Sequence, residues 1–215
     1  MWKKINDQLD WVPYFTVSDV AQHLDIENDV SARLLSRWVK NNRVIRIKRG
    51  LYMSREYFVR HARESDFSGM VSAIINPSSY LSKEYVLQKH QVMTEAVYGV
   101  TSCTTKNTSR VVGKLGSYLY YHVKSELFGG YLSESNGVIT INEATLGKAL
   151  FDYLYLRPQG WAYGDKEYNL VEDLRLNLEG FSKEDIVDFE YWVEKSGSKK
   201  MQDALSNIRR HVWLS

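Results

Sequence analysis

Disulfide bridges, a secretion signal and a long apolar run are all missing from this sequence of 215 residues. The one cysteine is Cys103, which excludes a disulfide within the chain and fits a reducing compartment. The first residues, Met-Trp-Lys-Lys-Ile-Asn-Asp, lack the apolar core of a signal peptide. No run of about 18 apolar residues occurs, which is the length that a membrane-spanning helix needs. We therefore expect a cytoplasmic protein without a membrane span.

The motifs of common catalytic and metal sites are missing as well. The histidines lack metal-ligand spacing, and no Gly-x-Ser-x-Gly sequence occurs. Gly147-Lys148 resembles the end of a phosphate-binding loop, but Asn142 stands where that loop needs its first glycine. We therefore expect no metal, no cofactor and no enzymatic activity. One catalytic alternative stays open, a metal-dependent nuclease whose acidic pairs converge in space: Asp165/Glu167, Glu172/Asp173 and Asp188/Glu190.

Positive charge is concentrated in one segment. The whole chain has 28 Lys and Arg against 26 Asp and Glu, a formal net charge of +2. Residues 33–63 hold ten of the bases but only one acid, Glu56, so the rest of the chain is net acidic. This asymmetry indicates a polyanionic partner for the basic segment.

The N-terminal part is predicted to be helical first. Apolar residues at helical spacing predict a short helix over residues 1–12. Thr16 and Asp19 have the spacing of a capping box, which predicts that a second helix begins there. Asn28 is expected to be the N-cap of a third helix over residues 29–41.

A β-hairpin is predicted after these helices. Its strands are residues 44–47 and 51–53, and Gly50 supplies the positive φ at its basic tip. A further basic helix is predicted over residues 54–65. Helix, turn, helix and basic hairpin are the order of a winged helix-turn-helix domain, which we predict for residues 1–64.

The third predicted helix has a polar face opposite its apolar one. Placed in the major groove of DNA, such a face sets arginine against guanine, and a basic hairpin contacts phosphate or enters the minor groove. The alternative is an ordinary solvated surface. Trp38 and Tyr52 are predicted to lie in the core. The candidate DNA contacts are Arg33, Ser36, Arg37, Lys40, Arg46, Lys48 and Arg49.

Residues 65–215 are predicted to form a mixed α/β domain with a helical C-terminal tail, so the fold class is α+β. Residues 66–69, Asp-Phe-Ser-Gly, are interpreted as the linker. Strands are predicted over residues 97–104, 118–124 and 138–141, and helices over residues 82–91 and 144–156. Tail helices are predicted over residues 170–178, 183–195 and 199–211, the second opened by a capping box of Ser182 and Asp185.

The N-terminal motifs resemble a known family. Thr16-Val17-Ser18-Asp19-Val20-Ala21, the turn at Ile26, and Ile47-Lys48-Arg49-Gly50-Leu51-Tyr52 are similar to the winged-helix domain of AbiEi-type antitoxins. These antitoxins belong to bacterial abortive-infection toxin–antitoxin operons.

Two later segments are similar to the same family. Tyr80 to His90 resembles its Ser-x-x-x-Ala-Leu-x-x-His-Gly helix, with Val86 in place of the alanine and Gln91 in place of the glycine. Ala144 to Asp152 resembles its Glu-Lys-Ala-Leu-x-Asp helix, with Gly147 in place of the glutamate.

The resemblance implies a repressor that binds double-stranded DNA upstream of its own gene. It also implies that the chain counteracts a toxin partner that resembles a nucleotidyltransferase. Two alternatives stay open beside it. One is an enzyme acting on nucleic acid that uses the winged helix for targeting, and the other is an adaptor whose second domain binds a protein. The sequence leaves the oligomeric state open.

Overall fold

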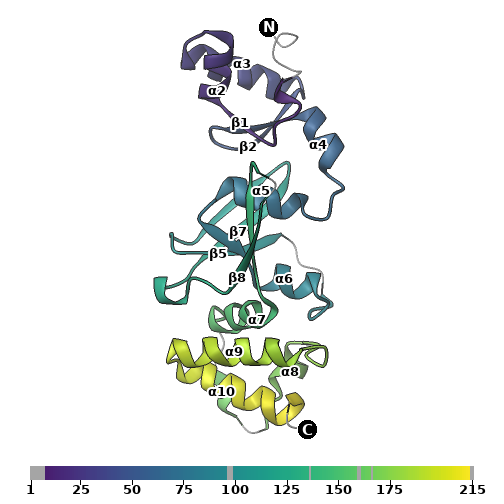
Figure 1. Ribbon diagram of the computed structural model, residues 1–215, viewed down its shortest axis with the longest axis vertical. Helices are drawn as coiled ribbons and strands as arrows, with labels where there is room; N and C mark the ends of the chain where they lie inside the picture. Colours follow the sequence, from purple (N-terminus) through teal and green to yellow (C-terminus); the bar gives the residue numbers. More distant parts are fainter. Residues whose placement is uncertain (1–7, 96–98, 136, 159–160, 166, 214–215) are drawn as a thin grey trace. The chain divides into compact units, whose positions relative to one another are not determined.

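The computed structural model describes residues 8–95, 99–135, 137–158, 161–165 and 167–213 (Figure 1). By its internal contacts the chain divides into two compact units. Unit 1 comprises Met1–Ile75 with Val111–Ser117, and unit 2 comprises Asn76–Arg110 with Tyr118–Ser215. The division therefore lies after Ile75, later in the chain than the boundary predicted after residue 64.

The linker predicted at residues 66–69 is wrong, because a helix begins there. Helix α5 spans Phe67–Ile75, and both Phe67 and Gly69 within it are buried. Ser68 and Gly69 favour loops. The apolar residues that follow outweigh this tendency, since they are buried and their burial stabilises the helix.

Unit 1 combines helices with a small antiparallel sheet. Its helices are α2 (Val17–Leu24), α3 (Asn28–Lys40), α4 (Arg55–His61) and α5. Its strands are β1 (Phe15–Thr16), β2 (Val44–Lys48) and β3 (Leu51–Ser54), in the order β1-β3-β2. The helices and the hairpin lie in the predicted order along the chain.

Two N-terminal helix caps were predicted in unit 1, one for α2 and one for α3. The capping box of α2 is confirmed: Asp19 N donates to Thr16 Oγ1 over 3.2 Å, and Thr16 N donates to the Asp19 carboxylate over 2.7 Å. The N-cap predicted for the third helix is wrong. Asn28 is the first residue of α3, and Glu27 before it makes no side-chain capping hydrogen bond. Ser31 Oγ instead donates to the first carbonyl of α2 over 2.8 Å, which holds the two helices together.

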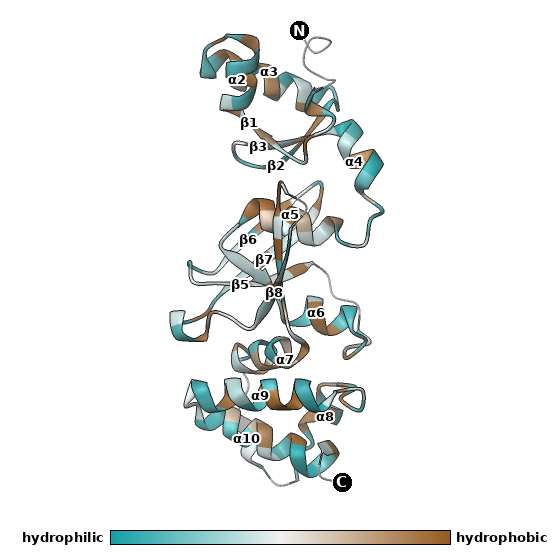
Figure 2. Cartoon of the chain, in the orientation of Figure 1, coloured by the Kyte–Doolittle hydropathy of each residue, from teal (hydrophilic) through white to brown (hydrophobic). Residues whose placement is uncertain are grey.

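The core of unit 1 lies between α2, α3 and the sheet. Trp38 and Tyr52 are buried in it, as predicted. Residues 1–7 of the first predicted helix lie outside the described part of the chain. Figure 2 shows that α2 and α3 each carry hydrophobic and hydrophilic residues. The buried cluster comprises Leu9, Phe15, Val20, Leu34, Leu35, Trp38, Val44 and Tyr52. Burial of each large apolar side chain contributes about 1.5–3 kcal/mol, so this cluster fixes which face of α3 meets solvent.

The hairpin β2–β3 turns at Gly50, whose φ is +82°. This value lies in the left-handed region, where a residue with a Cβ is strained. The pairing Arg46↔Tyr52 is followed by Lys48↔Leu51, so the register shifts within β2. Such a shift changes the direction in which the side chains after it point.

The larger sheet belongs mainly to unit 2. Its order is β6-β7-β5-β4-β9-β8, with parallel pairs β5–β7 and β4–β9 and antiparallel pairs β4–β5 and β8–β9. The strands are β4 (Ser79–Leu81), β5 (Val100–Thr104), β6 (Ser109–Gly113), β7 (Gly116–His122), β8 (Tyr131–Ser135) and β9 (Thr140–Ala144). The helices are α6 (Glu84–Lys89), α7 (Leu146–Tyr155), α8 (Leu170–Asp173), α9 (Lys183–Ser196) and α10 (Lys199–Ile208). Short helical turns are η1 (Ser125–Leu127), η2 (Trp161–Gly164) and η3 (Arg209–Trp213).

Prediction found two buried strands, β5 and β7, but missed the short buried strand β4 and the exposed strands β6 and β8. The strand predicted over residues 138–141 overlaps only the start of β9. β5 and β7 are strands, as predicted, although residues 97–98 of the first lie outside the described residues. β6 and β8 are largely exposed and show no alternation of buried and exposed positions, so no periodic pattern marked them. The mixed α+β character of unit 2 is confirmed.

The helical tail follows the prediction more closely. Ser182 and Asp185 form the predicted capping box of α9, with Asp185 N donating to Ser182 Oγ over 3.1 Å. α8 is shorter than predicted, because the chain leaves the helix before Leu176, which bridges to Met93. α9 packs closely on α7, where Gly147 lies against the backbone of α9.

Candidate nucleic-acid interface

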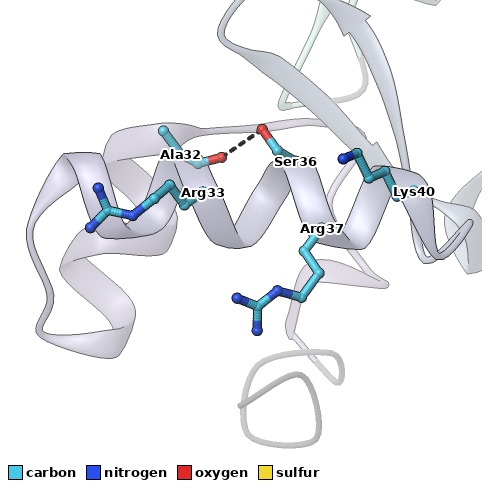
Figure 3. A pocket seen from close by; sticks show the side chains of 5 residues that line it. All are labelled: Ala32, Arg33, Ser36, Arg37 and Lys40. Carbon is cyan, nitrogen blue, oxygen red and sulfur yellow. Dashed lines mark hydrogen bonds between the residues drawn. The ribbon is translucent and has the colours of Figure 1, made fainter.

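The exposed face of α3 carries the strongest candidate site. Leu34, Leu35 and Trp38 are buried on its inner side. On its outer side Arg33, Ser36, Arg37 and Lys40 are all exposed, as the helical periodicity predicted. Together with Ala32 these residues line a shallow depression on the surface (Figure 3).

The charged groups of this face are not engaged by the protein. Among the residues that the structure describes, Arg33, Arg37 and Lys40 have no side-chain hydrogen bond and no ion pair. Ser36 Oγ donates to the Ala32 carbonyl over 3.0 Å, so its proton is used within the helix (Figure 3). This face carries three cations against one exposed acid, Asp29 in the first turn of α3, so its net charge creates a local positive potential.

The hairpin β2–β3 holds three of the residues predicted to contact DNA. Arg46 and Arg49 are exposed. Lys48 is half-buried instead, and its Nζ donates to the Ile75 carbonyl over 2.6 Å. That carbonyl lies in the last turn of α5, where backbone carbonyls have no hydrogen-bond donor within the helix. Lys48 is therefore engaged by the protein itself, and its predicted contact with phosphate stays a prediction.

Sequence analysis missed one cation that the fold brings close to the hairpin. Residues 111–117, which are the end of β6, the start of β7 and the turn between them, group with unit 1. Lys114 in this turn is exposed, and its Nζ donates to Asn42 Oδ1 over 3.2 Å. Asn42 lies two residues after the last residue of α3, so Lys114 adds positive charge near the C-terminal end of that helix. No local pattern indicated this placement, because the two residues are far apart in the sequence.

Helix α4 contributes a second basic region. Arg55, Arg60 and Arg63 are exposed on it or just after it. The Arg60 guanidinium lies 4.4 Å from the centre of the Trp11 ring and donates to the Asp10 carbonyl over 3.2 Å. Arg60 is thus held in place by a cation–π contact and a hydrogen bond, unlike the cations of α3.

The motif residues of unit 2 meet in a buried network. Lys148 and Asp152 of α7 form an ion pair, with Nζ 2.6 Å from Oδ1 and both side chains fully buried. Asp152 Oδ2 accepts from Tyr80 over 2.9 Å and from Ser82 over 2.8 Å. Lys148 Nζ also donates to the Leu127 carbonyl over 2.9 Å. The two segments with family resemblance, one from Tyr80 and one ending at Asp152, are therefore joined directly.

The titration properties of this network indicate a structural role. Burial, reinforced by the Asp152 carboxylate, raises the pKa of the Tyr80 hydroxyl far above its usual value, so that it remains a donor. Burial likewise raises the pKa of the Cys103 thiol, which disfavours the reactive thiolate. Both buried charges of the ion pair are matched by partners, as buried charges must be.

Within the described residues no three His, Cys, Asp or Glu side chains gather in a way that could hold a metal ion. No described helix is long and apolar enough to cross a bilayer. The chain matches no protein-family model and no curated protein sequence.

Proposed function

We propose that this chain is a sequence-specific DNA-binding regulator in which unit 1 acts as a winged helix-turn-helix domain. α3 is the recognition helix, and the hairpin β2–β3 is the wing. The observation that carries the proposal is the outer face of α3, where Arg33, Arg37 and Lys40 are exposed and lack protein partners.

Charge and shape support double-stranded DNA as the ligand. The major groove of DNA is wide enough to admit an α-helix, and its edges are rich in hydrogen-bond acceptors. The phosphates beside the groove would face the exposed Arg46 and Arg49 of the hairpin. Binding by such a surface releases counterions from DNA, so affinity must fall as salt rises.

We further propose that the chain is an antitoxin that represses its own operon and counteracts a nucleotidyltransferase-like toxin. The support is the resemblance to AbiEi-type antitoxins together with the network that joins its motifs. Ser82, Lys148 and Asp152 lie in those motifs and are all buried. They would therefore stabilise unit 2 as a scaffold, and any contact with a toxin would use other residues.

The DNA-binding proposal is tested by gel shift on the DNA upstream of the gene, with unrelated duplex of equal length as the control. We expect the upstream DNA to be bound more tightly, and the difference to vanish when Arg33 and Arg37 are both changed to alanine. Lys199→Ala is the matched control, because Lys199 is an exposed cation outside the proposed surface. Equal binding of both duplexes by the unchanged protein would contradict the proposal.

The antitoxin proposal is tested in cells. A nucleotidyltransferase-like gene that neighbours this one is expressed with and without the full chain, and growth is followed. We expect growth to be rescued by the chain and by its Arg33→Ala/Arg37→Ala variant. Failure of the unchanged chain to rescue growth would refute the antitoxin part alone.

A further inference from the structure

We infer that α3 reads guanine at two positions of its DNA site, through Arg33 and Arg37. This inference rests on the proposed DNA binding and specifies the bases that the surface would recognise. The guanidinium group offers only donors, arranged as a planar fork. In the major groove guanine presents two acceptors, N7 and O6, that match this fork, whereas adenine presents one acceptor and one donor.

The spacing of the two arginines sets the spacing of the guanines. Arg33 and Arg37 are four residues apart on the exposed face of α3. A helix rises about 1.5 Å per residue, so their Cα atoms are separated by about 6 Å along its axis. Successive base pairs are about 3.4 Å apart on a strand. A helix lying along the groove therefore places the two guanidinium groups about two base pairs apart.

Ser36 adds a third and different contact. Its hydroxyl proton is donated to the Ala32 carbonyl, so its oxygen can only accept a hydrogen bond from a base. Only adenine N6 and cytosine N4 present donors in the major groove. Ser36 lies beside Arg37 on the same face, in the depression that the arginines line. A cytosine or adenine next to the guanine read by Arg37 would donate a hydrogen bond to Ser36 Oγ.

The test selects binding sites for the full chain from a library of random duplexes and then replaces single guanines by 7-deazaguanine. This base keeps its Watson–Crick pairing but lacks the N7 acceptor. We expect selected sites to share two guanines about two base pairs apart, and each replacement to weaken binding about tenfold, within the range for one bidentate contact. The selected sites should also favour cytosine or adenine beside one guanine, and Ser36→Ala should remove that preference.

Variants assign each guanine to its arginine. In the Arg33→Ala protein, 7-deazaguanine at one of the two positions should no longer weaken binding, and in the Arg37→Ala protein the same should hold at the other position. In each case the arginine that would donate to N7 is already absent. Lys40→Ala, the control, should weaken all duplexes alike and leave both sensitivities unchanged. Specific sites without the two guanines, or sensitivities that persist in both arginine variants, would overturn the inference while leaving DNA binding intact. Recovery of no specific site would overturn the proposed function itself.

Discussion

Lys148 and Asp152 form an ion pair with no exposure to solvent, Nζ lying 2.6 Å from Oδ1 one helical turn away. A buried charge without its partner is strongly disfavoured, because the interior cannot replace the lost hydration. The pair therefore ties α7 to β4 through Tyr80 and to the Leu127 carbonyl. Removal of either charge should weaken several contacts at once.

The first prediction concerns this pair. Lys148→Met should lower the free energy of unfolding by about 3–5 kcal/mol, because it leaves the Asp152 carboxylate buried without its cation. Urea unfolding followed by circular dichroism measures this change. The double variant Lys148→Met/Asp152→Leu should be more stable than the sum of the single losses predicts. Lys199→Ala is the control, because it breaks an exposed pair with Asp203 and should cost less than about 1 kcal/mol.

The second prediction concerns the crossing of α7 and α9. A Cβ on Gly147 would overlap the Asp185 carbonyl oxygen and lie 2.8 Å from Phe189 N. Gly147→Ala should therefore force the helices apart and cost about 1–3 kcal/mol in unfolding free energy. At Gly180 a Cβ meets nothing within 4 Å, so Gly180→Ala should change stability by less than about 0.5 kcal/mol. Equal effects of the two substitutions would show that the helices do not pack as closely as described.

The third prediction separates Lys48 from Arg49. Lys48→Met removes the hydrogen bond to the Ile75 carbonyl and should lower the unfolding free energy by about 1–3 kcal/mol, with little effect on DNA affinity. Arg49→Ala should leave stability nearly unchanged and weaken binding to operator and random duplex equally. Thermal unfolding and fluorescence anisotropy with labelled duplex measure the two properties. Loss of affinity in a stable Lys48→Met protein would place Lys48 at the DNA after all.

The fourth prediction is a steep dependence of DNA affinity on salt. Each neutralised phosphate contributes about −0.9 to the slope of log affinity against log salt concentration, so several contacts should give about −4 or steeper. Anisotropy titrations at increasing sodium chloride measure the slope. Arg46→Ala and Arg49→Ala should each make it shallower by about one unit, whereas a flat response in the unchanged protein would refute an electrostatic DNA interface.

The fifth prediction concerns the extent of unit 1. A fragment of residues 1–64 lacks α5, whose Ile75 carbonyl accepts the hydrogen bond from Lys48. It should unfold at a lower urea concentration than a fragment of residues 1–75, which keeps that helix. The longer fragment should also bind DNA more tightly than the shorter one. Indistinguishable fragments would favour the boundary after residue 64.

Local patterns in the sequence determined helices α2, α3 and α4 and the outer face of α3, but not α5, whose start they predicted as a linker. The Thr16/Asp19 capping box, the apolar stripe of α3 and the positive φ of Gly50 depend on residues only a few positions apart. The exposed cations of α3 were predictable for the same reason. A charged side chain stays in solvent unless the fold supplies a partner, and none lies opposite this face in the described structure.

Only the tertiary structure decided the contacts between distant residues. Ser82 and Asp152 are 70 positions apart and Lys114 and Asn42 are 72 apart, so no local pattern could pair them. The sequence predicted Lys48 to be another exposed cation, but α5 brings the Ile75 carbonyl within 2.6 Å of its Nζ. The exposed strands β6 and β8 exist because neighbouring strands offer hydrogen bonds, which leave no hydrophobic signal in the sequence. The sequence determined which side chains face solvent on a helix, and the fold determined which of them remain free to act there.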